Sequence, residues 1–421
     1  LDFVNYFIQR SYIWLGSQNF GMGISTFMGA LPLHGIQYVL SILGVPYLDI
    51  QKVGLVFWFA AVAFSMYVSV RYFFKDSDQW IIRMLAVIFY SINFYIFLFW
   101  PIGSQTTLSA YPLLPLSFLI GYRFIDKDLS PLKAATYFNL AYFIFNGGGV
   151  GGFPLMGPVI IVISGLLLYQ LTISFRKSYI LDVIKLLFFS LILFIILNAY
   201  FLFPFLFSFT EQFNALVSQS GGIDGVINWT KFISRFDSYI NLFRLQGDNI
   251  WYVKNSSYPN FFLTNPVFIV LSFVFVIFSY SNLLFNFTER IKKLLFFLIP
   301  ISLVGIFFSA GAHDPLGFLY IFMLEHVPGF AAFRSGYYKF VPLIYFPYAI
   351  LFGMAVYHIT SKIKHNMRIF MQISFIIFIF GYHYPFFDNG NFLTVYKYPT
   401  MVKVPDYVTE FAGLRLPKDD E

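Results

Sequence analysis

The chain of 421 residues contains no cysteine. A disulfide framework, a thiolate metal site and a cysteine nucleophile are therefore all excluded. The absence of cysteine leaves the redox compartment open. The motif HExxH, which binds zinc on a helix, is absent as well, so the sequence assigns no metal ligands.

Charged residues are scarce, at 11% of the chain, whereas a soluble domain contains about 25%. Apolar residues make up 58%, and the mean hydropathy is +0.72. This composition predicts an all-α polytopic membrane protein whose partners include membrane lipids. The net charge of +7 does not indicate nucleic-acid binding, because the basic residues lie mostly in short links between apolar segments.

The sequence begins with Leu1 and carries no signal peptide or lipidation motif. It shows no internal repeat and no low-complexity linker. We expect that the true N-terminus lies upstream of Leu1.

A helix needs about 20 apolar residues to cross the hydrocarbon core of a bilayer. Ten stretches meet or approach that length, six in residues 52–209 and four in residues 265–387. The ten predicted spans are 52–74, 82–100, 106–124, 132–146, 153–175, 180–209, 265–285, 292–310, 340–359 and 367–387.

The links between these spans alternate in charge. Five of them carry three Lys or Arg residues each, and the short links 101–105 and 146–152 carry none. Positively charged links favour the cytoplasmic side, so the intervening segments are predicted to be extracytoplasmic. The predicted outer segments are 1–51, 210–264, 311–339 and 388–421.

The first outer segment predicts helices that lie at the membrane interface rather than across it. Asp2–Leu15 and Leu31–Leu43 have amphipathic patterns, and residues 1–51 are too polar and too often broken by Gly and Pro for a span. The alternative is that Ile24–Leu43 forms an eleventh span, which would invert the charge alternation. With ten spans, both Leu1 and the last residue of this sequence lie on the outer side. The simplest explanation is one further helix before Leu1, which brings the total to eleven.

The outer segment 210–264 is long and polar, and its aromatic residues recur at spacings of three and four. That spacing predicts one amphipathic helix near 225–245. Aromatic faces and carboxylates bind sugars, and Trp229 is the candidate for such a contact. The alternative is a solvated cap with a helix lying on the surface.

The outer segment 311–339 holds the densest group of ionisable residues. Arg334 and Lys339 suit a phosphate, because Arg offers a planar fork of donors and Lys adds a point charge. The alternative is that both side chains reach towards lipid headgroups. The remaining candidate substrate-binding residues here are His313, Asp314, Glu325 and His326, and His34 is a further candidate in the first outer segment.

Two weaker features also lie on the outer side. Asp2 is the only acidic residue before Asp49, and it could act as a general base for a sugar hydroxyl or be an ordinary surface residue. The glycine-rich stretch 146–154 could let a substrate approach closely, although a tight turn between helices is the favoured interpretation.

Three stretches carry a resemblance to GT-C class membrane glycosyltransferases, and most closely to the membrane domain of the alpha-(1→3)-arabinofuranosyltransferase family. The first is the opening, with Leu1-Asp2-Phe3, Trp14, Phe20-Gly21, Pro32, Leu43-Gly44-Val45-Pro46 and Gln51. The second is Phe333-Arg334 followed by Lys339-Phe340, a proline and Gly353. The third is Val404-Pro405-Asp406-Tyr407, which resembles the junction with a soluble domain.

The resemblance implies a GT-C-type helix bundle that moves a sugar, with arabinofuranose as the candidate, from a polyprenyl-phosphate donor to a glycan or glycolipid acceptor outside the cytoplasmic membrane. It implies that Asp2 is the catalytic base or lies just after it, and that Arg334 and Lys339 bind the donor phosphate. A divalent cation stays open as a cofactor. The chain differs from the family in its abundance of Phe, Tyr, Ile and Asn.

Two other functions compete with this interpretation. A transporter or flippase of lipid-linked sugars would carry ionisable residues within its spans, and here the spans are almost free of them. A non-catalytic subunit for envelope-polysaccharide assembly would lack the acid of the first outer segment.

Overall fold

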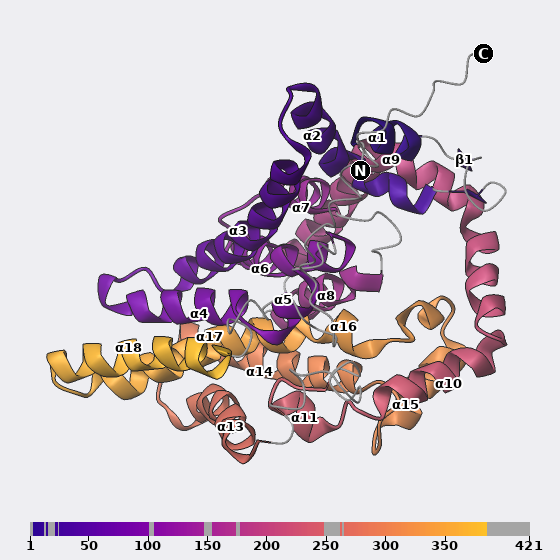
Figure 1. The fold of residues 1–421 in the computed structure, drawn as a ribbon. Helices are drawn as coiled ribbons and strands as arrows, with labels where there is room; N and C mark the ends of the chain where they lie inside the picture. The colour runs from indigo at the N-terminus through magenta and orange to yellow at the C-terminus, as the bar shows by residue number, and fades with distance from the viewer. Residues whose placement is uncertain are drawn as a thin grey trace, which may run out of the picture.

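The computed structural model describes residues 3–11, 14–15, 22–23, 25–100, 105–146, 154–173, 177–247, 262 and 265–384. The described part is almost entirely helical, apart from one antiparallel pair of two-residue strands, β1 (Trp14–Leu15) and β2 (Met22–Gly23). Eight of its helical segments are long and apolar enough to cross a membrane. The prediction of an all-α polytopic membrane protein is confirmed (Figure 1).

The bundle is built from ten helices, and one of its spans consists of two helices in sequence. They are α3 (Tyr47–Phe73), α4 (Trp80–Ser91), α5 (Phe94–Phe99), α6 (Gln105–Ile125), α8 (Gly157–Ile173), α9 (Lys177–Gln219), α13 (Pro266–Ser281), α14 (Glu289–Ala310), α17 (Pro342–Ser361) and α18 (His365–Tyr382). A further helix, α7 (Pro131–Phe145), packs beside α6 and α9. The two predicted spans 132–146 and 367–387 correspond to α7 and α18, which are not among the eight candidates. With 15 residues, α7 is shorter than the ~20 that a perpendicular crossing needs.

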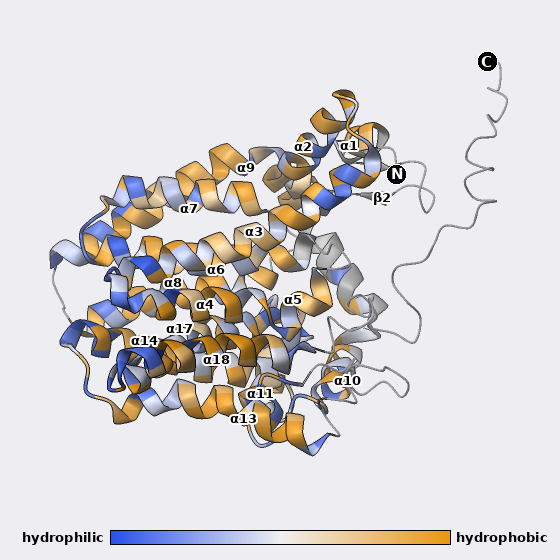
Figure 2. Cartoon of the chain, turned by 60° about the vertical axis from the view of Figure 1, so that its left-hand side comes forward, coloured by the Kyte–Doolittle hydropathy of each residue, from blue (hydrophilic) through white to orange (hydrophobic). Residues whose placement is uncertain are grey.

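The described parts of the five basic links lie together at one end of the bundle, which we call the basic end. The Tyr72 hydroxyl at the end of α3 donates to Asp126 and Asp128 in the α6–α7 turn, at 2.9 Å each. Arg290 at the start of α14 lies 3.8 Å from Asp126. The Tyr357 hydroxyl near the end of α17 donates to Asp78 beside α4 at 2.5 Å. Figure 2 shows hydrophilic turns gathered at the left-hand end of the helices.

Eight short helical elements lie at the opposite end of the described bundle. They are α1 (Phe3–Arg10), η1 (Ser25–Ala30), α2 (Leu31–Ile42), α10 (Gly222–Ser234), α11 (Tyr239–Phe243), α15 (Gly317–His326), η6 (Phe330–Phe333) and α16 (Gly336–Phe340). The 12 residues of α2 are too few for the alternative span over Ile24–Leu43. Which side of a membrane this end faces stays a prediction.

The single helix predicted near 225–245 is in fact two. α10 ends at Ser234, and α11 starts afresh because the Ser238 side chain caps it by accepting from the Asn241 backbone nitrogen at 3.3 Å. The predicted loop also starts later than residue 210, since α9 continues as helix to Gln219. α9 contains Pro204, and Figure 1 shows it passing along the edge of the bundle to α10.

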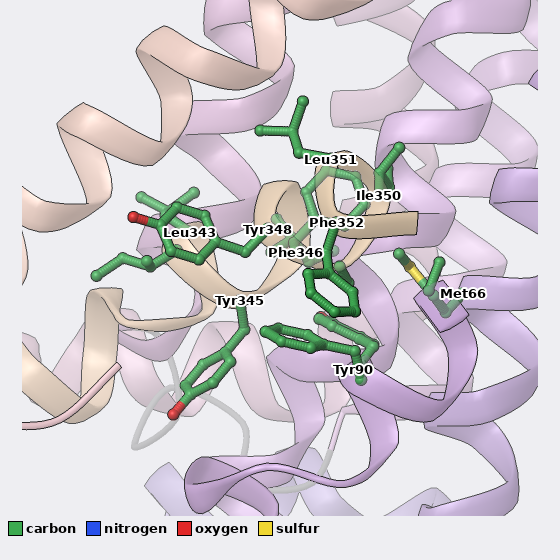
Figure 3. Packing of buried hydrophobic residues seen from close by; sticks show 14 of the residues in the cluster. Met66, Tyr90, Leu343, Tyr345, Phe346, Tyr348, Ile350, Leu351 and Phe352 are labelled. Carbon is green, nitrogen blue, oxygen red and sulfur yellow. The ribbon is translucent and has the colours of Figure 1, made fainter. Parts of the chain in front are cut away.

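α17 is the central helix of the bundle. It packs against α4, α6, α8, α13, α14 and α18. Tyr345, Phe346 and Tyr348 are completely buried, and Figure 3 shows α17 side chains meeting Tyr90 from α4. A helix that is apolar on all sides and surrounded by other helices is expected to be the least mobile element of such a bundle. The segment that directly precedes α17 in the chain is therefore anchored to a well-packed helix.

Two glycines allow helices to approach α17 closely. A Cβ atom on Gly353 of α17 would lie 2.9 Å from the carbonyl oxygen of Ile82 in α4. A Cβ atom on Gly305 of α14 would lie 2.7 Å from the Cβ atom of Leu343. Small residues at helix crossings let backbones pack closely in membrane bundles, where lipid offers no hydrophobic driving force.

The second predicted span, 82–100, is interrupted in its middle. α4 ends at Ser91 and α5 begins after Asn93. The Asn93 side chain accepts from the Ile96 backbone nitrogen at 3.2 Å and donates to the Tyr90 carbonyl oxygen at 2.7 Å. Asn93 thus satisfies backbone groups that the break would leave without partners inside the bundle.

Candidate functional site

The segment from Gly329 to Phe340 forms the core of the candidate site. Gly329 has φ of +82°, a backbone conformation that glycine adopts without cost, and η6 follows it. The rings of Phe333 and Phe340 stack with centroids 5.3 Å apart. A Cβ atom on Gly157 of α8 would lie 2.9 Å from the Phe340 ring, so α8 supports this stack directly.

Two cations are adjacent in sequence to the stacked rings: Arg334 follows Phe333, and Lys339 precedes Phe340. Arg334, which is half-buried, donates from Nη1 to the hydroxyl oxygen of Ser220. Lys339 is 6% exposed, and its Nζ donates to the carbonyl oxygen of Ala332. The charge of Arg334 acts on Lys339, so the two residues that the sequence predicts for phosphate binding lie near each other in this segment.

Neither cation is neutralised by a described carboxylate. Within the described ranges, no Asp or Glu oxygen lies within 4.0 Å of Arg334 or Lys339. Burial, and secondarily the charge of Arg334, lowers the pKa of Lys339 to about 7. A bound anion would oppose both effects, because its negative charge favours the charged form of the lysine.

Trp229 from α10 reaches this segment across a long separation in sequence. Its indole Nε1 donates to the hydroxyl oxygen of Ser335 at 3.1 Å. The side chain is 46% exposed, so part of the indole face stays open. The two outer segments predicted from the sequence, 210–264 and 311–339, thus meet at Arg334 and Ser335.

A small apolar core holds α10, α15 and η6 in this arrangement. It consists of Val226, Ile227, Tyr320, Leu324 and Ala331. The Tyr320 hydroxyl donates to the carbonyl oxygen of Phe333 at 2.6 Å, directly before Arg334. Burial raises the pKa of Tyr320, so its hydroxyl stays protonated and continues to donate.

His313 and Asp314 lie in the turn between α14 and α15. The His313 Nδ1 atom lies 2.7 Å from the backbone carbonyl oxygen of Asp314, and its ring meets Tyr239 edge-on with centroids 6.3 Å apart. The imidazole therefore meets the backbone of Asp314 rather than its carboxylate. This geometry gives no support to an acid/base pair formed by the two side chains.

Glu325 and His326 lie at the end of α15. The His326 Nδ1 atom is 3.9 Å from the Glu325 carboxylate and 3.0 Å from the Phe322 carbonyl oxygen, and its ring stacks on Phe322 at 4.3 Å. Both side chains are exposed. Their described contacts lie within α15, so they are neighbours of the candidate site and not part of its cation pair.

His34 belongs to the N-terminal helices. It is buried on α2, and its Nδ1 atom lies 3.0 Å from the Gln37 side-chain oxygen. α2 packs against α1, α3 and α7. His34 therefore takes part in the packing of that layer, and the described contacts do not join it to Arg334.

Three sequence predictions lie outside the described residues. They are the proposed base Asp2, the glycines 147–152 of the stretch 146–154, and the tail 388–421.

Sequence reasoning missed Ser220 and Ser335. Ser335 directly follows Arg334, and Ser220 precedes two glycines, Gly221 and Gly222, with φ of +81° and +79°. A Ser-Gly-Gly run before an amphipathic stretch is a helix-start signal that places α10 at Gly222. That signal locates the helix correctly but not its contact with Arg334.

One cavity lies deeper in the described bundle. It is lined by Asn93, Arg244, Tyr345, Tyr382, His383 and apolar neighbours. Its free volume of about 10 Å³ is enough for roughly one water molecule, so it cannot hold a sugar or a phosphate. In the described ranges, no three His, Asp or Glu side chains are grouped in a way that could hold a metal ion.

Comparison of the chain with known protein families, with curated proteins and with solved structures finds no match. The function must therefore be argued from the site itself.

Proposed function

We propose that the chain is a GT-C-type membrane glycosyltransferase that takes a sugar from a polyprenyl-phosphate donor and passes it to a glycan or glycolipid acceptor outside the cytoplasmic membrane. The observation that carries the proposal is the convergence of Arg334 and Lys339. They lie at the end of the bundle away from the basic links, and no described carboxylate lies within ion-pair distance of either.

Such a pair suits a phosphate both in binding and in reaction. The planar Arg334 fork can donate two hydrogen bonds to phosphate oxygens, and Lys339 adds a charge from a buried position. When the sugar leaves, negative charge grows on the donor phosphate. Cations that are already in place stabilise this charge without further reorganisation.

Trp229 supports the sugar side of the proposal. Its hydrogen bond to Ser335 fixes the indole next to Arg334, while about half of its surface remains exposed. An aromatic face beside a phosphate site can pack on the sugar ring attached to that phosphate. The base remains assigned to Asp2 by resemblance alone.

The distribution of buried charge argues against a transporter. The buried Asp, Lys, Arg and His side chains of the described residues are His34, Asp237, Arg244, Lys339 and His383, and none belongs to the eight candidate spans. Arg244 and His383 line the cavity beside Asn93, and its free volume of about 10 Å³ is too small for a sugar to pass. Transport pathways place such groups near the middle of the membrane. An assembly subunit that binds the lipid without chemistry is the remaining alternative.

The experiment is a transfer assay with purified membranes and a panel of radiolabelled polyprenyl-phosphate sugars. Wild type is compared with Arg334→Ala, and Lys362→Ala at the basic end is the matched control. Loss of one such donor group costs about 100- to 1,000-fold in rate. Arg334-dependent incorporation from one donor supports the proposal. Equal incorporation by wild type and Arg334→Ala contradicts the assigned phosphate site.

A further inference from the structure

α15 is fixed close to the end of a membrane-spanning helix. Only residues 311–316 separate it from Ala310, the last residue of α14. The turn is tied to α10, because the Ala312 backbone nitrogen donates to the Ser234 hydroxyl oxygen at 3.0 Å. α15 therefore cannot extend far from the bundle.

The two sides of α15 differ sharply. Tyr320 and Leu324 face the protein and are almost completely buried. Phe318, Leu319 and Phe322 are 62%, 42% and 55% exposed, and α15 contains no Lys or Arg. Side chains of this size gain free energy when they are removed from water.

The candidate span that directly precedes α15 also exposes apolar side chains. On α14, Phe296 and Leu303 are 64% and 45% exposed, seven residues apart on one face of a candidate span. α15 follows this helix after a short turn and presents apolar side chains again. Within α15 itself, the charged or ionisable residues are Glu325 and His326, in its last turn.

A cation lies over aromatic rings at the end of the neighbouring helix α10, where Arg235 directly follows Ser234. The Arg235 guanidinium lies 4.3 Å from the ring centroid of Phe232 and 4.4 Å from that of Phe236. Phe232 is 48% exposed. A cation above partly exposed aromatic rings is typical of the boundary between acyl chains and headgroups.

We propose that α15 lies in this boundary layer of the bilayer, with Phe318, Leu319 and Phe322 inserted among the acyl chains. The helix packs on η6, and its Tyr320 hydroxyl is bonded to the Phe333 carbonyl oxygen. Its depth therefore sets the depth of Arg334, at the level of lipid phosphates. The proposal concerns the lipid contact alone and does not depend on sugar transfer.

The absence of cysteine allows a direct test. Single variants Phe318→Cys and Phe322→Cys are labelled with an environment-sensitive fluorophore and reconstituted in phosphatidylcholine vesicles. Quenching is then measured with iodide in the water and with nitroxide groups placed near the headgroup end of the acyl chains. We expect strong quenching by the nitroxide lipids and weak quenching by iodide.

Two labelled controls make the comparison specific. Glu325→Cys lies three residues from Phe322 at the polar end of the same helix, and Ser361→Cys lies exposed at the basic end. Both should be more accessible to iodide than the Phe318 and Phe322 positions. Because the two phenylalanines are exposed, their replacement removes little packing, and monodispersity in detergent confirms the fold.

Two results would overturn the proposal. Equal iodide quenching at Phe318, Phe322 and Glu325 would show that α15 is surrounded by water. Protection from both quenchers would show that protein, either a second copy or another chain, covers this side. A failure of the transfer assay leaves this experiment unaffected, so the two proposals can fail separately.

Discussion

The indole nitrogen of Trp229 and the hydroxyl oxygen of Ser335 are 3.1 Å apart, although 106 residues separate them in the chain. This bond joins α10, the helix directly after the long helix α9, to Ser335, the residue that follows Arg334. Together with the bond from Arg334 to Ser220, it attaches α10 to the candidate phosphate site at two points.

Replacing Trp229 tests the separate contributions of its ring and its hydrogen bond. Trp229→Phe keeps an aromatic face but removes the donor, which costs about 1 kcal/mol for a neutral hydrogen bond. We expect a modest rise in KM for the donor. Trp229→Ala should reduce transfer much further, because it also removes the aromatic face. Phe232→Ala, on the exposed side of α10, is the control. Equal kinetics for Trp229→Phe and Trp229→Ala would exclude a contact between the ring and the sugar.

Lys339 predicts a pH dependence of donor binding. Its pKa of about 7 means that the free site loses this charge as pH rises through neutrality. A bound phosphodiester favours the protonated form, so affinity should decrease from about pH 6 to about pH 9. Lys339→Met should bind more weakly and lose most of this dependence, while Arg334 stays charged throughout. A lipid-binding titration at several pH values measures this, and a flat profile for wild type would contradict it.

Gly353 predicts a strict packing requirement in the centre of the bundle. A side chain there meets the Ile82 backbone at 2.9 Å, and overpacking typically costs about 1–3 kcal/mol. Gly353→Leu should lower the thermal unfolding temperature in detergent strongly, and Gly353→Ala less so. Gly381→Ala in α18 is the matched control, because a Cβ atom there meets nothing within 4 Å. Similar unfolding temperatures for Gly353→Leu and Gly381→Ala would show that α4 and α17 are not packed so closely.

The position of the five basic links predicts opposite labelling of the two ends. Asp314→Cys and Ser361→Cys are both exposed and lie at opposite ends of the bundle. A membrane-impermeant thiol reagent should label Asp314→Cys in intact cells and Ser361→Cys only after permeabilisation. The reverse pattern would overturn the orientation, and labelling of both in intact cells would contradict the span assignment.

Much of the architecture follows from composition and charge alone. Long apolar segments and the alternation of basic links predict the helices and the common end of the five basic turns. The sequence does not predict where helices break. Asn93 interrupts a span because its amide can bond the freed backbone groups, and Ser238 separates α10 from α11 by capping the second helix.

For the candidate site too, the sequence indicates some residues but not the contacts between them. Arg334, Lys339 and Trp229 were recognisable because cations and aromatic residues are rare or distinctive in an outer segment. Their approach to one another depends on contacts across more than 100 residues, such as Arg334 with Ser220, which no local pattern contains. His34, Glu325 and His326 were selected by residue type alone, and the described contacts do not join them to the cation pair.

Equilibrium binding of a polyprenyl monophosphate to the reconstituted protein tests the phosphate site most directly. Wild type, Arg334→Ala, Lys339→Met and the double variant are compared. Each single change should weaken binding at least tenfold. The double variant should lose less than the sum of the two losses in binding free energy, because both residues hold one phosphate. Unchanged affinity in both single variants would contradict the central claim that Arg334 and Lys339 form a lipid-phosphate site.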